Sequence, residues 1–284
     1  MLSIPQPKPD AGPPPGTPAA VEPLLRLGAI SKTFGAVAAL KGFEASIRPG
    51  EFVTVVGPSG CGKSTLFNIV AGLEEPDTGG IVRFEGKSCH AHELLGRVSF
   101  MPQRDLLFPW RNVIDNAILA MEVEGVPRKQ ARAEALRMLP EFGLGGFEAQ
   151  YPHQLSGGMR QRVALMRTFL FKRELILLDE PFGALDALTR SIMQRWLLDV
   201  WQQHARTILF ITHDVDEAIF LGDRVLVVTA RPGRVKLEKT VDLPRPRTPD
   251  IVTSPAFIEI KRGLLEAIEE ESMKSFLSTQ EQHR

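Results

Sequence analysis

A glycine-rich loop has the residue types and spacing of a phosphate-binding site. Residues 57–65 read Gly-Pro-Ser-Gly-Cys-Gly-Lys-Ser-Thr and match the pattern Gly-x-x-x-x-Gly-Lys-Ser/Thr. Glycines let backbone N–H groups close around phosphate oxygens, and the N-terminus of a following helix adds partial positive charge. The loop therefore predicts a nucleotide site in which Lys63 reaches the β- and γ-phosphates and the Ser64 hydroxyl ligates Mg²⁺.

Two adjacent carboxylates form a second candidate site. Asp179 and Glu180 directly follow an apolar run at residues 175–178, which predicts a buried strand. Ligands of α/β proteins bind at the carboxyl ends of such strands, so Asp179 is expected to hold Mg²⁺ and Glu180 to polarise an attacking water as a general base. Acidic residues at strand ends can also simply cap the next helix. Together with the loop, the pair predicts a nucleoside triphosphatase, although a small-molecule kinase also fits these two motifs.

The elements that must position these motifs follow an alternating pattern. Residues 51–57 form a β-branched run that predicts the strand before the loop, and residues 207–212 and 224–229 predict two further buried strands. Helical segments are expected near residues 160–172 and 187–204. Alternation of this kind predicts a parallel sheet with helices packed on both faces.

Between about residues 104 and 154 the strand patterns stop and helical patterns such as residues 128–142 take over. This change predicts a helical subdomain, at about residues 104–160, inserted into an α/β core that spans residues 24–239. A chain of 284 residues is long enough for one large domain or two small ones, and the inserted helical lobe favours a single domain.

The composition excludes several classes of protein. The 34 basic residues balance 34 acidic ones, so there is no basic excess that would favour a nucleic-acid partner. Two cysteines cannot form a disulfide framework, which excludes a small secreted scaffold. No run approaches 18 consecutive apolar residues, so no membrane-spanning helix is expected, although a membrane partner is compatible with the sequence.

Both ends of the chain differ from the core. Eight of the 22 prolines fall in residues 1–23, which predicts a disordered or polyproline-like tail. The extension at residues 240–284 contains a predicted helix near Ser254–Phe276, with Ser254 as its cap and Pro255 in its first turn. The simpler interpretation is that its apolar stripe docks on the core, and the alternative is a regulatory or dimer-contacting helix. The stripe comprises Phe257, Ile260, Leu264, Leu265 and Ile268.

A third motif could bind a second anion. Residues 155–162 read Leu-Ser-Gly-Gly-Met-Arg-Gln-Arg and precede a predicted helix, whose N-terminus attracts negative charge. A serine cap followed by a glycine turn would explain Ser156–Met159 if they stood alone. The segment resembles the signature sequence of ABC ATPases, in which it faces the phosphate loop of a partner chain so that ATP is sandwiched between two subunits.

The order of further motifs is similar to the same family from about residue 24 to residue 233. Phe34 lies 23 residues before Gly57, where the family places an aromatic residue, often tyrosine, that stacks on adenine. Gln103 in Met-Pro-Gln matches the glutamine that contacts Mg²⁺ and the attacking water. Asp186 in Ala-Leu-Asp matches the loop that communicates across the dimer, and His213 in Thr-His-Asp matches the switch histidine that contacts the γ-phosphate. Each match taken alone also fits a purely structural role.

The resemblance implies an α/β fold of the P-loop NTPase class, with a RecA-like parallel sheet core, an antiparallel β edge and the inserted helical subdomain. It implies hydrolysis of ATP with Mg²⁺, with catalytic roles for Glu180, His213, Gln103 and Lys63. The implied ATP contacts are Phe34, Gly57, Pro58, Ser59, Gly60, Cys61, Gly62, Lys63, Ser64 and Thr65. The implied signature contacts with ATP across the dimer are Ser156, Gly157, Gly158 and Gln161, and the implied Mg²⁺ ligands are Ser64, Gln103 and Asp179.

The segment Gln103–Asn116 looks like its counterpart in importers for nitrate, sulfonates, taurine and related solutes, a group that includes pyrimidine precursors of thiamine. Residues 151–155 and Arg231–Arg234 resemble that group too. The resemblance implies a homodimer at the cytoplasmic face of a prokaryotic inner or plasma membrane, with transmembrane permease subunits and, indirectly, a solute-binding protein as partners. Residues 106–110, Leu-Leu-Phe-Pro-Trp, are the expected docking patch for the permease, with packing inside the helical subdomain as the alternative. Other functions left open are a non-transport ABC ATPase and a system for an unrelated substrate.

Overall fold

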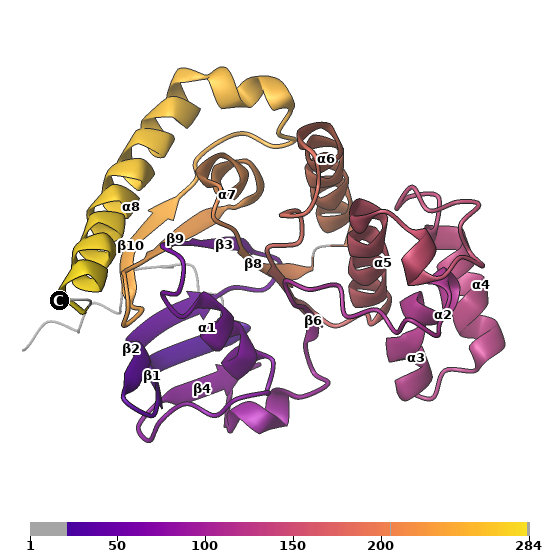
Figure 1. The fold of residues 1–284 in the computed structure, drawn as a ribbon, viewed down its shortest axis with the longest axis horizontal. Helices are drawn as coiled ribbons and strands as arrows, with labels where there is room; N and C mark the ends of the chain where they lie inside the picture. The colour runs from indigo at the N-terminus through magenta and orange to yellow at the C-terminus, as the bar shows by residue number, and fades with distance from the viewer. Residues whose placement is uncertain (1–21, 205, 283–284) are drawn as a thin grey trace, which may run out of the picture.

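The computed structural model describes residues 22–204 and 206–282. A six-stranded sheet in the order β10-β9-β3-β8-β7-β6 forms the centre of the fold (Figure 1). Every pairing in it is parallel except that of β10 with β9. Its strands are β3 (Phe52–Val56), β6 (Ser99–Met101), β7 (Leu175–Asp179), β8 (Thr207–Ile211), β9 (Arg224–Val228) and β10 (Val235–Thr240). The carboxyl ends of β3, β7 and β6 lie at one edge, so this sheet brings the phosphate loop, the acidic pair and Gln103 together.

The four central strands are buried along their whole length, because helices cover both faces of the sheet. All residues of β3, β7, β8 and β9 are buried. Buried parallel strands are nearly continuous apolar runs rather than alternating ones, which is why the sequence reveals them clearly. The helices around them are α1 (Lys63–Val70), α5 (Gly157–Leu170), α6 (Ala187–His204) and α7 (Val215–Leu221).

A second, antiparallel sheet forms the predicted β edge. Its order is β2-β1-β4-β5, made of β1 (Leu25–Phe34), β2 (Val37–Ile47), β4 (Ile81–Phe84) and β5 (Lys87–Cys89). Its inner face packs Ile30, Phe43 and Phe84 against Phe67 of α1. The 3₁₀ helix η1 (Ala91–Leu94) leads from this sheet to β6. The sheet therefore fixes the start of α1, and with it the phosphate loop.

A lobe of helices follows β6, as the sequence predicts. It contains α2 (Val113–Ala117), α3 (Leu119–Val123), α4 (Arg128–Met138) and the 3₁₀ helix η2 (Pro152–Gln154), all before α5 (Figure 1). α5 begins at Gly157 rather than near residue 160, because the Ser156 hydroxyl accepts a hydrogen bond from the Met159 N–H at 3.2 Å and caps the helix.

The C-terminal extension folds back along the core. After η3 (Pro249–Thr253), helix α8 (Pro255–Gln282) runs beside α7, β9 and β10 and is longer than the predicted Ser254–Phe276 (Figure 1). Phe257, Ile260 and Leu264 are buried in the main core, so the apolar stripe docks on its own domain. Among the described residues, no helix is both long and apolar enough to cross a bilayer. The predicted proline-rich tail, up to residue 21, lies outside the described residues.

Candidate active site

The phosphate loop joins β3 to α1 in a conformation that requires glycine. Gly62 has φ 99°, and a Cβ there would lie 2.6 Å from the Ala39 carbonyl oxygen of β2. A Cβ at Gly57 would lie 2.8 Å from the carbonyl oxygen of Val228 in β9. The loop is therefore packed between two strands, and larger residues would displace it.

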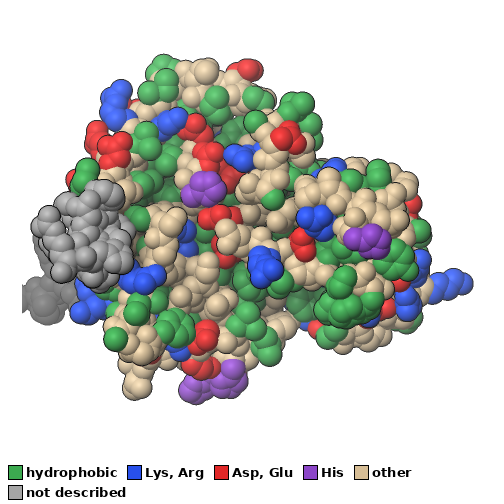
Figure 2. Space-filling view, in the orientation of Figure 1, with side chains coloured by type: hydrophobic (Ala, Val, Ile, Leu, Met, Phe, Trp, Pro, Cys, Tyr) green, Lys and Arg blue, Asp and Glu red, His purple; other side chains and the backbone are tan. Residues whose placement is uncertain are grey.

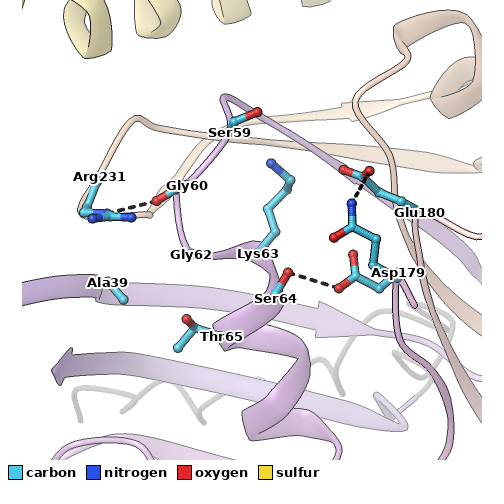
Figure 3. Close-up of a pocket in the computed structure, with 11 residues that line it drawn as sticks. Ala39, Ser59, Gly60, Gly62, Lys63, Ser64, Thr65, Asp179, Glu180 and Arg231 are labelled. Atoms are coloured by element: carbon cyan, nitrogen blue, oxygen red, sulfur yellow. Dashed lines mark hydrogen bonds between the residues drawn. The ribbon is translucent and has the colours of Figure 1, made fainter. Parts of the chain in front are cut away.

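The Lys63 side chain extends from the first residue of α1 into the space beside the loop (Figure 3). Its ammonium group donates hydrogen bonds to the carbonyl oxygens of Gly57 at 2.8 Å and Pro58 at 2.9 Å. Phosphate oxygens carry a full negative charge and are stronger acceptors than these carbonyls. The ammonium is consequently in place to exchange loop carbonyls for the phosphates of a nucleotide.

Ser64 and Asp179 meet across the pocket although 115 residues separate them in the chain (Figure 3). The Ser64 hydroxyl donates a hydrogen bond to Asp179 Oδ2 at 3.0 Å. Burial raises the pKa of Asp179, and this hydrogen bond opposes the rise. A hydroxyl next to a buried carboxylate is an oxygen donor set that suits Mg²⁺, because a cation would offset the cost of burying the negative charge.

The substitution Asp179→Asn is expected to separate fold stability from metal-dependent binding. Because burial raises the pKa of Asp179, the ionised carboxylate destabilises the nucleotide-free fold at any pH above its ordinary pKa. The free energy of unfolding of the asparagine variant should therefore equal or exceed that of the original chain. The stabilisation by Mg²⁺ and ATP, about 2.7 kcal/mol for ligand at a hundredfold excess over Kd, should nearly vanish. Urea unfolding with and without Mg²⁺ and ATP measures both effects, with Asp250→Asn as a surface control. Undiminished stabilisation of the variant would contradict the assignment.

The Glu180 carboxylate is contacted by the side chains of Gln103 and His213. Gln103 Nε2 donates a hydrogen bond to Glu180 Oε2 at 3.0 Å, and His213 Nδ1 lies 3.4 Å from the same oxygen. Glu180 has φ 47°, a strained value for a residue with a side chain, and its N–H is anchored to the Ile211 carbonyl oxygen at 3.0 Å. The carboxylate points into the pocket (Figure 3), where Gln103 and His213 contact one of its oxygens.

Lys63, Ser64, Gln103, Asp179 and Glu180 line one pocket of about 300 Å³ at the carboxyl edge of the sheet, whereas His213 contacts Glu180 without lining the pocket. The carboxylates lie on one side of Lys63 and the Arg231 guanidinium on the other (Figure 3). Sequence reasoning missed Arg231 and Ala39 as lining residues; the only signal for Arg231 was the family-like segment Arg231–Arg234. Among the residues that the structure describes, the lining is Ala39, Ser59, Gly60, Gly62, Lys63, Ser64, Thr65, Gln103, Asp179, Glu180 and Arg231.

Comparison with known proteins identifies the family. A family model described as "ABC transporter" matches residues 40–183, about half of the chain, which include the phosphate loop, the Ser156 segment and the acidic pair. The chain belongs to the ABC transporter family. It is 43% identical to the aliphatic sulfonates import ATP-binding protein of Albidiferax ferrireducens, over 87% of this chain and 84% of that relative. It is 44% identical to the formylaminopyrimidine import ATP-binding protein of Halalkalibacterium halodurans, over 69% of this chain and 76% of that relative.

A solved ABC cassette has the same fold. A dimeric structure of an ATP-binding cassette in a post-hydrolysis state, bound to ADP and phosphate, matches with a TM-score of 0.68 and 30% identity. The match covers 77% of this chain and 99% of that one. These findings confirm the predicted P-loop NTPase fold and the activity of an ABC ATPase that binds and hydrolyses ATP.

The ABC signature segment is not part of the pocket of its own chain. Ser156, Gly157 and Gly158 do not line the pocket, and a Cβ at Gly157 would meet nothing closer than 3.8 Å. Gln161 differs from the other three predicted signature contacts: it is buried, and its Nε2 donates to the Gln103 carbonyl oxygen at 3.3 Å. The structure therefore links the signature helix to the Gln103 segment within one ABC ATPase chain.

The predicted ATP contacts Gly57, Pro58 and Cys61 belong to the phosphate loop but do not line the pocket, and Phe34 and Asp186 lie away from it. Phe34 is at the tip of the β1–β2 hairpin, 46% exposed, with the Lys32 ammonium 5.2 Å from its ring centroid. Its ring is thus available for stacking but does not line the phosphate pocket. Asp186 caps α6 by accepting a hydrogen bond from the Thr189 N–H at 3.0 Å, and this bond lowers its pKa.

Proposed function

We propose that the chain is the ATP-hydrolysing subunit of an importer for a small solute: nitrate, a sulfonate, taurine or a related compound, or a pyrimidine precursor of thiamine. The observation that carries the proposal is the convergence of Gln103 and His213 on the Glu180 carboxylate, beside Lys63 and the Ser64–Asp179 pair. Relatives named for import of aliphatic sulfonates and of formylaminopyrimidine support the import direction and the solute class.

The predicted site residues, inside and outside the pocket, divide the work of hydrolysis among them. Glu180 accepts a proton from the water that attacks the γ-phosphorus, while Gln103 and His213 hold its carboxylate in place. Lys63 neutralises the negative charge on the phosphate oxygens as the bond to the leaving ADP breaks. Ser64, Asp179 and Gln103 would hold Mg²⁺, which would supply positive charge to offset the negative charge of the phosphates. Phe34 stacks on adenine, and Asp186 communicates with the second subunit.

A second copy of the chain completes each site in this proposal. Residues 24–239 form the ATPase domain, with the helical subdomain at about residues 104–160, and its signature residues Ser156–Gly158 contact the ATP held by the partner. The dimeric cassette with ADP and phosphate supports this arrangement. It also accounts for a signature segment whose N-terminal glycines lie outside the pocket of their own chain.

The permease subunits dock on an apolar surface between the core and the helical lobe. Trp110 is 71% exposed and stacks on Phe108 with ring centroids 5.0 Å apart, which supports docking by this part of residues 106–110. Leu107 does not belong to the exposed patch: it is buried in the main core, as the alternative of internal packing has it. A groove of about 340 Å³ lies beside this segment, and the sequence did not predict it. Arg167 lines the groove and joins it to the segment, because its guanidinium donates hydrogen bonds to the Asp105 and Leu106 carbonyl oxygens. Hydrophobic side chains gather on the surface between β6 and the helical lobe (Figure 2). The groove is lined by Ala71, Leu73, Leu95, Gly96, Val98, Phe100, Leu119, Ala120, Val123, Arg167, Thr168 and Phe171.

The substitution Trp110→Asp is expected to weaken association with the permease about 30-fold or more, because loss of a central aromatic from an interface commonly costs at least ~2 kcal/mol. ATP affinity should not change, since Trp110 does not line the nucleotide pocket. Pull-down from detergent extracts and titration with a fluorescent ATP analogue measure the two effects. Ile258→Asp on α8 is a matched control, because Ile258 is also an exposed apolar residue. Unchanged capture of Trp110→Asp would contradict this docking surface.

Transport itself tests the proposal. The chain, its permease and the cognate solute-binding protein would be reconstituted in vesicles at the cytoplasmic face of the bilayer, and ATP-dependent accumulation of nitrate, taurine, an alkanesulfonate and a formylaminopyrimidine would be compared. Accumulation of one of them supports the proposal. Active hydrolysis without any association with a membrane protein would favour a non-transport ABC ATPase, and accumulation only of an unrelated solute would overturn the solute class.

A further inference from the structure

The turn between β9 and β10 lies directly against the phosphate loop. Arg231 Nε donates a hydrogen bond to the Gly60 carbonyl oxygen at 2.9 Å, and the Gly233 N–H donates to the Ala39 carbonyl oxygen at 2.9 Å. A Cβ at Gly233 would lie 2.2 Å from the Cys61 carbonyl oxygen. The turn therefore has no room to shift without moving the loop.

Helix α8 holds the same turn from its other side. Glu271 Oε2 accepts a hydrogen bond from the Ala230 N–H at 2.9 Å, and Glu271 Oε1 lies 3.0 Å from the Lys236 ammonium and 2.7 Å from that of Lys274. The Glu271 side chain is 4% exposed. Burial alone would raise its pKa, but the hydrogen bonds from Lys274, Ala230 and Lys236 lower the pKa to about 2, so the group is ionised at neutral pH. A buried, ionised side chain with this many donors is a rigid attachment point.

The chain of contacts from α8 reaches the nucleotide site in three steps. Glu271 fixes Ala230, the neighbouring Arg231 binds Gly60, and Gly60 belongs to the loop that surrounds the phosphates. Among the described residues, Lys63 and Arg231 are the two cationic side chains that line the pocket. The two cations lie in different places, since Arg231 is on the side of Lys63 away from Glu180 (Figure 3). In the proposed site Glu180 faces the γ-phosphate, so Arg231 is placed away from the reacting group.

We propose that Arg231 is a positioning residue for ATP binding, which keeps the phosphate loop in its binding conformation through Gly60 and is itself positioned by Glu271 of α8. This inference rests on the ATP site proposed above. It gives the C-terminal extension a function: α8 sets the affinity of the ATPase for its nucleotide. Because Arg231 acts on the loop and not on the attacking water, it contributes equally to the ground state and the transition state, so its loss raises KM and leaves kcat nearly unchanged.

Steady-state ATP hydrolysis by the full chain, together with the Kd of a fluorescent ATP analogue, tests the proposal. Arg231→Ala should raise KM and Kd roughly three- to tenfold, the effect expected for one hydrogen bond, with kcat within about twofold. Arg231→Lys keeps a donor and should recover part of the affinity. Glu271→Gln should raise KM in the same direction by a smaller factor. In a double-mutant cycle, Glu271→Gln should have no further effect once Arg231 is alanine.

Two neighbours serve as matched controls. Arg234→Ala removes a cation from the β9–β10 turn. Glu270→Gln removes a carboxylate of α8, and this carboxylate binds Lys236 but not the Ala230 N–H. Neither should change Kd, and urea unfolding confirms that every variant is folded. An unchanged Kd in Arg231→Ala, or a fall in kcat without a change in KM, would overturn the positioning role. Additive effects in the cycle would overturn the link to α8. These outcomes are distinct from failure of the hydrolysis assignment, since Kd is measured without turnover.

Discussion

Glu180→Gln is expected to stop ATP turnover while leaving ATP binding intact. The glutamine amide keeps the shape of the side chain, but it cannot accept a proton from the attacking water. General-base catalysis contributes about 10²–10⁴-fold to a rate, so kcat should fall by at least about 100-fold. The change leaves Lys63 and the Ser64–Asp179 pair in place. ATP that is bound and not hydrolysed should hold two copies together, which makes the variant a dimer in the presence of ATP.

Phosphate release and analytical ultracentrifugation with Mg²⁺ and ATP measure the two expectations. Glu174→Gln is a matched control, because Glu174 is exposed and adjoins the opposite end of the same strand. The control should hydrolyse ATP normally and show no ATP-dependent dimer at steady state. If Glu180→Gln hydrolysed ATP at the normal rate, the general base would have to be another group, and the convergence of Gln103 and His213 on Glu180 would need a structural explanation.

The parts of the fold that the sequence predicted correctly are those whose signal is local. The buried parallel strands β3, β7, β8 and β9 each appear as one apolar run, and the phosphate loop is a contiguous motif between a strand and a helix. The position of Asp179 and Glu180 at the carboxyl end of β7 could also be predicted, because they come directly after its apolar run in the sequence. The joint order of motifs then sufficed to indicate the family.

The parts that the sequence did not predict depend on contacts between distant segments. The apolar groove combines residues that follow α1, residues of the η1–β6 connection and β6, and residues of α3 and α5, and none of these segments has an unusual composition of its own. Arg231 enters the pocket only because the β9–β10 turn packs on the phosphate loop, 171 residues away in the chain. Gln161 was predicted as a contact with the partner's ATP, and its burial could not be inferred from its place in the signature segment.

The separation of the two anion-binding segments within one chain leads to a test of the dimer. The phosphate loop, Asp179 and Glu180 lie in one pocket, and the signature glycines do not line it. If each ATP is held by the loop of one copy and the signature of the other, a lesion in the loop and a lesion in the signature of the opposite copy damage the same site. The second site of that mixed dimer stays intact.

Mixing Lys63→Ala with Gly157→Asp is therefore expected to restore activity that neither variant has alone. Gly157 has room for a side chain, and an aspartate in the first turn of α5 suits the helix while its charge repels phosphate. Each variant alone should lose about 100-fold or more in turnover, because every site in its dimer is damaged. With random pairing about half of the dimers are mixed and each has one intact site, so the mixture should regain about a quarter of the normal rate if the sites act independently.

Phosphate release, measured after the two variants have been refolded together, gives the result. A mixture of Lys63→Ala with Glu180→Gln is the matched control, because these lesions lie in the phosphate-loop halves of opposite sites and leave no site intact. That control should stay inactive. If the Lys63→Ala and Gly157→Asp mixture were no more active than the mean of its components, each chain would have to hydrolyse ATP with its own residues alone. The signature segment would then be a helix cap and not half of a shared site.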